Sequence, residues 1–102
     1  MRVAFKMKLK PGMQAEYQKR HEAIWPELAK LISDAGISDY SIFLDAETNI
    51  LFAVQEVAGQ NSQALGENPV VQQWWIYMAD LMETNPDHSP VSKPLVEVFH
   101  LE

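Results

Sequence analysis

The chain has 102 residues, no cysteine and a formal net charge of −6 at pH 7. This length supports one folded domain over residues 1–102 without covalent cross-links. The composition excludes disulfide and thiolate chemistry. Its few Lys and Arg residues supply little of the positive surface that nucleic acids and anionic membranes require. No signal peptide and no run of ~20 apolar residues is visible, so we expect a cytoplasmic protein with no nucleic-acid or membrane partner.

The amino-terminal segment predicts a half-buried strand, because apolar residues alternate with Lys, Arg or Ala. The apolar members are Val3, Phe5, Met7 and Leu9. A period of two places them on one face of a strand, which the following Pro11-Gly12 pair ends.

A helical pattern follows from about Met13 to Ala35, with Gly36 at the position of a C-terminal cap. Pro26 lies inside this pattern. Because proline lacks a backbone N–H and crowds the preceding turn, we expect the helix to kink or break there. Trp25 should then lie outside ideal helical geometry.

Two further strands are predicted in the middle of the chain, over residues 37–45 and 50–57. The polar connection 46–49 is short enough for an antiparallel hairpin. The polar stretch that follows, residues 59–68, predicts no more than a short helical turn around residues 62–65.

A second helix is predicted to begin with Asn68 as its N-cap and Pro69 as its first residue, and to end near Thr84. Turn-forming residues predict an ordered loop without regular structure over residues 85–94. Residues 95–101 predict a fourth strand.

The element order is strand, helix, strand, strand, helix, strand. It predicts an α+β fold of the ferredoxin-like βαββαβ type, with a four-stranded antiparallel sheet. Right-handed crossovers place both helices on one face of this sheet. Strands 50–57 and 95–101 are apolar on both faces, although the helices cover only one. We therefore expect a homodimer of the dimeric α+β barrel type, which buries the uncovered face.

His21 is the candidate for chemistry, because its titratable ring lies within the apolar stripe of the first helix. A histidine in such a place is more often a core residue than a catalyst. Tyr17 precedes it by four residues, so the phenol and the imidazole lie on the same helix face and can share a ligand. Tyr40 faces the apolar side of its strand, where its hydroxyl needs a partner. Taken alone, Tyr40 is more simply a core residue.

Trp74 and Trp75 straddle the apolar stripe of the second helix. As core residues they would be bulky for so small a domain. Indole faces also cover the C–H face of a sugar ring, while a few polar groups fix its hydroxyls. With His21 and the tyrosines, the tryptophan pair is compatible with a pocket for a small sugar.

Other chemistries find no support in the sequence. The histidines at positions 21, 88 and 100 lack metal-ligand spacing, so we expect no metal site. The glycines never cluster into a phosphate-binding loop, and no serine has glycine neighbours on both sides. We expect no nucleotide, flavin or other cofactor.

Short motifs spread over nearly the whole chain resemble the L-rhamnose mutarotase family. They are Tyr17-x3-His21, Ile24-Trp25-Pro26-Glu27-Leu28, Tyr40 before Ile42 and Leu44-Asp45, Trp74-Trp75 before Tyr77-Met78, Asn85-Pro86-Asp87 with Ser89-Pro90-Val91, and Val98-Phe99. The resemblance implies a dimeric ferredoxin-like fold that interconverts the α and β anomers of L-rhamnose without a cofactor. It also implies that His21 is the proton donor. The residues that it implies contact the sugar are Tyr17, Tyr40, Trp74 and Trp75.

The chain departs from the family pattern at two places. Phe43 stands where some relatives are expected to carry tyrosine, and Glu22-Ala23 stands where a more polar or proline-containing pair is common. Hydrogen bonding around the rim of the sugar site is therefore expected to differ.

The reaction requires one proton to leave the anomeric hydroxyl and one to reach the ring oxygen. Imidazole suits the acid role because its ordinary pKa is near neutral. The base remains open among Tyr17, Tyr40, a carboxylate and a bound water. Two other classes of function also remain open, because fold alone does not imply function. They are a cofactor-free dimeric binding module and a small monooxygenase or isomerase that acts on a hydrophobic ring.

Overall fold

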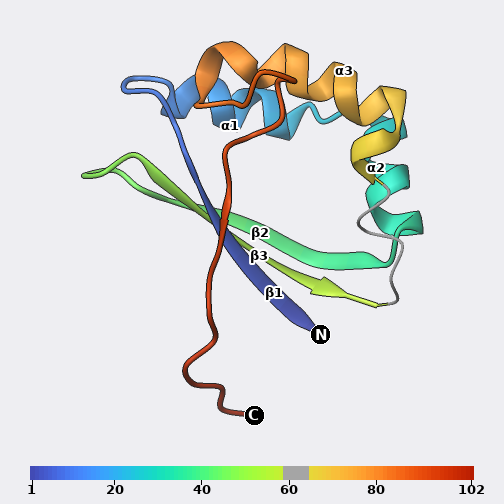
Figure 1. Ribbon diagram of the computed structural model, residues 1–102, viewed down its shortest axis with the longest axis vertical. Coiled ribbons are helices and arrows are strands. Elements are labelled where there is room, and N and C mark those ends of the chain that lie inside the picture. The colour runs from blue at the N-terminus through green and yellow to red at the C-terminus, as the bar shows by residue number, and fades with distance from the viewer. Residues whose placement is uncertain (59–64) are drawn as a thin grey trace.

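The computed structural model describes residues 1–58 and 65–102, in which helices cover one face of a four-stranded sheet (Figure 1). The elements are β1 Arg2–Lys8, α1 Gln14–Glu22, α2 Pro26–Asp34, β2 Ile37–Asp45, β3 Ile50–Val57, α3 Pro69–Met78, the 3-10 turn η2 Ala79–Leu81 and β4 Lys93–Pro94. The strands pair antiparallel in the order β2-β3-β1-β4. This is the strand order of a ferredoxin-like sheet, so the predicted α+β class is confirmed.

Pro26 divides the predicted first helix into α1 and α2. The backbone of Trp25 is extended, with φ −61° and ψ 128°, and Pro26 is the first residue of α2. The expected break at Pro26 and the displacement of Trp25 are therefore confirmed. The break has a consequence for packing, because it brings the ring of Trp25 to 5.1 Å from that of Trp74 on α3.

Helix α3 begins as predicted and ends earlier than predicted. The side chain of Asn68 caps it by accepting a hydrogen bond of 2.9 Å from the backbone N–H of Val70. The helix gives way to η2 at Ala79 instead of continuing to Thr84. The tighter 3-10 geometry leaves carbonyls near the end of α3 without their usual α-helical partners. The predicted turn around residues 62–65 lies almost wholly outside the described residues.

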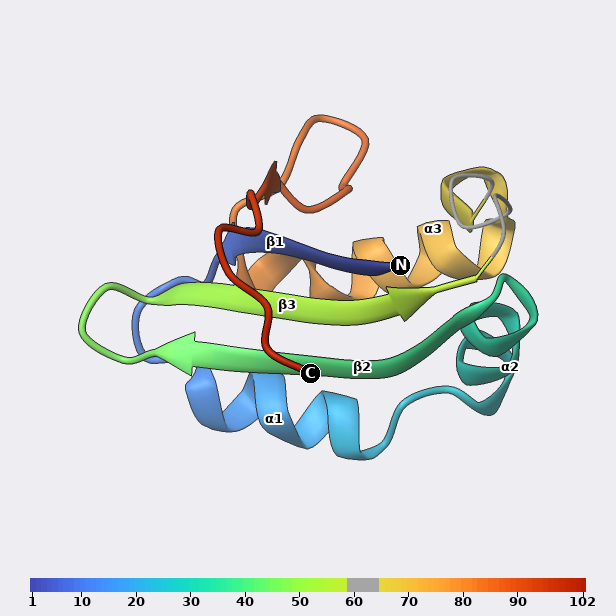
Figure 2. The same ribbon diagram turned by 90° about the horizontal axis from the view of Figure 1, so that it is seen from below.

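The predicted fourth strand over residues 95–101 is wrong. Only Lys93–Pro94 pair with β1, opposite Phe5 and Lys6, and Leu95 adds one backbone hydrogen bond to Ala4. Beyond Leu95 the chain leaves the sheet on the side away from the helices (Figures 1 and 2). An alternating apolar segment becomes a strand only where it pairs with a neighbouring strand, and among the described residues the pairing with β1 ends at Leu95.

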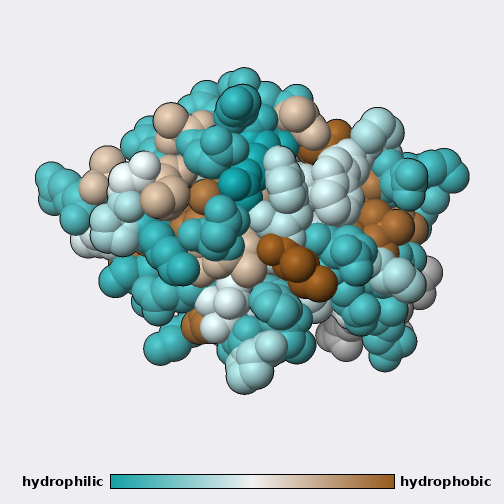
Figure 3. Space-filling model, turned by 90° about the horizontal axis from the view of Figure 1, so that it is seen from above, coloured by the Kyte–Doolittle hydropathy of each residue, from teal (hydrophilic) through white to brown (hydrophobic). Residues whose placement is uncertain are grey.

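The two faces of the molecule differ in polarity. The outer surface of the helical layer is mostly hydrophilic (Figure 3). On the opposite side, Phe43 alternates with the inward Ile42 and Leu44, and 64% of the residue is exposed. The helices therefore shield one face of the sheet only. Within residues 1–58 and 65–102, no helix combines the length and the apolarity needed to cross a bilayer.

Candidate active site

All five predicted site residues border one cavity of about 1030 Å³ between the sheet and the helices. Helix α1 contributes Tyr17 and His21, β2 contributes Tyr40, and α3 contributes Trp74 and Trp75. Most of the remaining lining is aliphatic or aromatic. A largely apolar cavity with a few polar groups is the usual form of a site for a small organic ligand.

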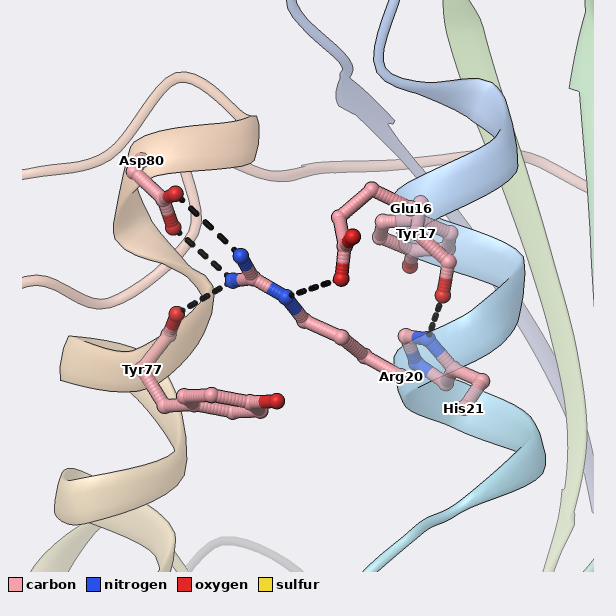
Figure 4. A network of polar contacts seen from close by, with 6 residues as sticks. All are labelled: Glu16, Tyr17, Arg20, His21, Tyr77 and Asp80. Carbon is pink, nitrogen blue, oxygen red and sulfur yellow. Dashed lines mark hydrogen bonds and ion pairs between the residues drawn. The ribbon is translucent and has the colours of Figure 1, made fainter.

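His21 is held in a defined orientation by its own helix. Its Nδ1 lies 3.0 Å from the carbonyl oxygen of Tyr17, one turn earlier (Figure 4). Because a carbonyl oxygen only accepts hydrogen bonds, Nδ1 carries a proton and donates it to this oxygen. In the neutral ring, Nε2 then has a free lone pair. Burial lowers the pKa of His21 below its ordinary value, and the hydrogen bond to Tyr17 opposes this shift in part.

Tyr17 and Tyr40 bring two phenols to the cavity. Burial raises the pKa of Tyr17 above its ordinary value, and the nearby Tyr40 adds to this shift. Burial also raises the pKa of Tyr40 to about 12. Both phenols therefore keep their protons near pH 7, where they can donate hydrogen bonds but are poor bases.

The sheet is irregular next to Tyr40. The register between β2 and β3 shifts between Ser38 and Ser41, and Asp39 has a φ of 48°. An extra residue of this kind bends a strand and re-aims neighbouring side chains. Tyr40 lies beside this irregularity and borders the cavity on the same side as Ile42 and Leu44, although 39% of the residue remains exposed.

The tryptophans form the α3 side of the cavity. Trp74 is 9% exposed and meets the ring of His21 edge to face, with the centroids 5.6 Å apart. Trp75 is half-buried and packs so closely on Gly66 that a Cβ there would lie 3.2 Å from the indole. Aromatic edge-to-face contacts favour a fixed geometry, so Trp74 holds one side of the imidazole.

The polar complement of the cavity is small. Among the described residues that border it there is no Asp or Glu. Residues 1–58 and 65–102 also hold no group of three or more His, Cys, Asp or Glu residues that could bind a metal ion. His21, the two phenols, three glutamines and His88 supply the polar side chains of this lining.

Sequence reasoning assigned no role to several residues around the site. Trp25 and Tyr77 extend the aromatic cluster beyond Trp74. Arg20 on α1 donates a hydrogen bond to the backbone carbonyl of Tyr77 near the end of α3 (Figure 4). The only sequence signal for Arg20 is the Glu16 that precedes it by four residues. Nothing in the sequence indicates that its guanidinium reaches a residue 60 positions away.

Comparisons with known proteins agree over the whole chain. A family model described as L-rhamnose mutarotase matches residues 2–101. The L-rhamnose mutarotases of Phocaeicola vulgatus and Bacteroides thetaiotaomicron are 63% and 65% identical over 102 residues, which cover 99% of this chain and 98% of each relative. The crystal structure of an L-rhamnose mutarotase from Formosa agariphila has a TM-score of 0.94 and 54% identity, and covers 100% of this chain and 99% of its own.

Proposed function

Because the chain belongs to the L-rhamnose mutarotase family, we propose that it interconverts the α and β anomers of L-rhamnose with His21 as the proton donor. The observation that carries this proposal is the state of His21 in the cavity, where Nδ1 donates to a carbonyl and Nε2 has no hydrogen-bond partner among the described residues. The proposed contacts to the sugar are Tyr17, Tyr40, Trp74 and Trp75.

We assign the role of the base, which accepts the proton of the anomeric hydroxyl, to the neutral ring of His21. No carboxylate borders the cavity within the described residues, and the raised pKa values of Tyr17 and Tyr40 make phenolates rare near pH 7. The lowered pKa of His21 favours the neutral ring, whose Nε2 can accept a proton. A bound water would serve only as a relay between the anomeric hydroxyl and this nitrogen.

The proposed cycle moves one proton through Nε2. The neutral ring takes the proton of the anomeric hydroxyl, the bond between C1 and the ring oxygen breaks, and C1 becomes a carbonyl carbon. The imidazolium then gives its proton to the ring oxygen. Rotation about the C1–C2 bond and the reverse sequence give the other anomer. Nothing is oxidised or reduced, so the cycle needs no redox cofactor. We place it in the cytoplasm, because a chain without cysteine suits a reducing compartment.

The direct test is NMR exchange spectroscopy on L-rhamnose with and without the protein. Faster exchange between the α and β anomers supports the proposal. Binding without faster exchange would instead indicate a binding module, and oxygen consumption with an aromatic substrate would indicate a monooxygenase. Parallel measurements on other 6-deoxyhexoses define which sugars the site accepts.

Trp75→Ala is expected to raise KM for L-rhamnose about tenfold, equivalent to roughly 1.4 kcal/mol of binding, with a smaller effect on kcat. The reason is that Trp75 borders the cavity, whereas the indole that meets the His21 ring is that of Trp74. Ile76→Ala is the matched control, because Ile76 follows on the same helix and is 50% exposed. Equal KM values for the two variants would show that Trp75 does not contribute to binding of the sugar.

A homodimer through the sheet face that the helices leave uncovered remains part of the proposal. Within the described residues nothing covers the apolar tail, since Val96 is 84% exposed, Val98 92% and Phe99 78%. Exposed apolar surface of this kind usually marks an association site. Analytical ultracentrifugation at micromolar concentration is expected to give twice the chain mass of 11.6 kDa. A variant truncated after Pro94 is expected to sediment as a single shortened chain. A full-length particle of 11.6 kDa would contradict the dimer.

A further inference from the structure

Arg20 connects the two helices that border the candidate site. It precedes His21 on α1, but the two side chains leave the helix in different directions (Figure 4). His21 borders the cavity, whereas Arg20 does not. The side chain of Arg20 is only 14% exposed, which is unusual for a residue type that is rarely buried unless it is paired.

The guanidinium uses all three of its nitrogens. Nη1 donates to the backbone carbonyl of Tyr77 at 2.6 Å and to the carboxylate of Asp80 at 2.9 Å, and Nη2 donates to the same carboxylate at 3.3 Å. Nε donates to the carboxylate of Glu16 at 3.0 Å. The guanidinium carbon also lies 4.6 Å from the centroid of the Tyr77 ring. A fork with this many partners fixes an orientation that a lysine ammonium could not reproduce.

The end of α3 provides a suitable acceptor. Because α3 changes to the 3-10 turn η2 after Met78, carbonyls in its last turn lack α-helical partners. A cation at the C-terminal end of a helix is also favoured by the helix dipole. The hydrogen bond from Arg20 also lowers the pKa of the Asp80 carboxyl group below its ordinary value.

A series of aromatic contacts connects Arg20 with the candidate site, beginning at the Tyr77 ring that its guanidinium covers. The ring centroids of Tyr77 and Trp74 lie 5.7 Å apart, and those of Trp74 and His21 lie 5.6 Å apart. Among the described residues, every side-chain hydrogen bond between α1 and the segment formed by α3 and η2 involves Arg20. His21 and Trp74 thus lie on two helices, and within the described residues Arg20 makes the side-chain hydrogen bonds that join them.

We propose that Arg20 is a positioning residue, which holds α1 against the end of α3 and thereby fixes the placement of His21 relative to Trp74. The proposal rests on the proposed mutarotase function. It predicts a loss in the chemical step, because a displacement of about 1 Å at a reacting group can cost 10²-fold in rate.

Arg20→Met is expected to lower kcat about ten- to a hundredfold while KM changes little, because Tyr17 and Tyr40 still contact the sugar. Asp80→Asn removes the charged partner and is expected to lower kcat by a smaller factor. Since both act through one link, the double variant should lose little more than Arg20→Met alone. Arg20→Lys keeps the charge without the fork and should recover only part of kcat.

Lys19→Met is the matched control, because Lys19 is exposed on the same helix and its loss changes the charge equally. It is expected to keep wild-type kcat. The rates are compared well below each variant's melting temperature, so that a purely stabilising role of Arg20 would leave kcat unchanged. Wild-type kcat in folded Arg20→Met would therefore overturn the proposal.

A readout independent of activity separates this proposal from the proposed function. Nuclear Overhauser contacts between ring protons of His21 and Trp74 are expected in the wild-type protein and in Lys19→Met, and should weaken in Arg20→Met. Weaker contacts in a protein that does not accelerate anomer exchange would sustain the positioning role and refute the mutarotase function. Unchanged contacts in Arg20→Met would refute the positioning role itself.

Discussion

Replacing His21 with alanine is expected to lower kcat/KM for L-rhamnose mutarotation by roughly 10²- to 10⁴-fold. This is the range that one positioned acid or base usually contributes. The loss should be large because both proton transfers of the proposed cycle pass through the Nε2 of this one ring. NMR exchange spectroscopy at matched protein concentrations measures it, with the rate in buffer as the reference.

The alanine variant also removes packing, since the His21 ring lies 4.3 Å from that of Tyr17 and 5.6 Å from that of Trp74. His21→Asn is the better test, because its amide can still donate to the Tyr17 carbonyl but does not titrate. We expect it to be as inactive as His21→Ala and to fold more stably. His100→Asn, on the exposed tail, is the matched control and should keep full activity. Full activity in His21→Asn would end the catalytic assignment.

Local chemistry is what the sequence predicts well in this fold. Pro26 has no N–H to give to the preceding turn, so the break between α1 and α2 follows from one residue. The Asn68 cap likewise depends only on its immediate neighbours. The pairing of Tyr17 with His21 could be predicted because helical spacing places both on one face.

Features that depend on distant partners could not be predicted from the sequence. The tail over residues 95–101 alternates as a strand should, but whether it pairs is decided by what lies beside β1. The reach of Arg20 to Asp80 depends on α3 ending four residues after Trp74, at Met78, where the chain turns into η2. The register shift in β2 also depends on the pairing with β3, whereas the side on which Tyr40 lies follows from alternation with Ile42 and Leu44. In each case the deciding partner is far away in the sequence.

The pH dependence of the reaction tests the assignment of the base. If neutral His21 starts the cycle, kcat/KM should be constant above the pKa of the free enzyme and fall about tenfold for each pH unit below it. Burial lowers this pKa, so the midpoint should lie below the ordinary value of 6.5. If a solvent-derived imidazolium started the cycle, kcat/KM would instead fall as pH rises through the same pKa. That result would contradict the assignment of neutral His21 as the base.

The same pKa shift predicts a pH dependence of stability with a definite sign. Between the lowered pKa of folded His21 and the unfolded value of 6.5, the unfolded chain binds more protons than the folded one. The free energy of unfolding must therefore decrease as pH falls through this window, and be unaffected by His21 above it. Urea titrations between about pH 7 and 5 measure the slope, which His21→Asn should abolish.

Carboxylates do not obscure this window. Asp80 and Glu56 have lowered pKa values, from ordinary values of 3.8 and 4.5, chiefly through hydrogen bonds from Arg20 and the N-terminal ammonium. Their contribution to stability is present above those ordinary values and is lost only as pH falls further. A slope near pH 6 that disappears in His21→Asn is thus attributable to the imidazole. An identical slope in both proteins would mean that the ring is not held neutral by burial, and the base assignment would lose its physical ground.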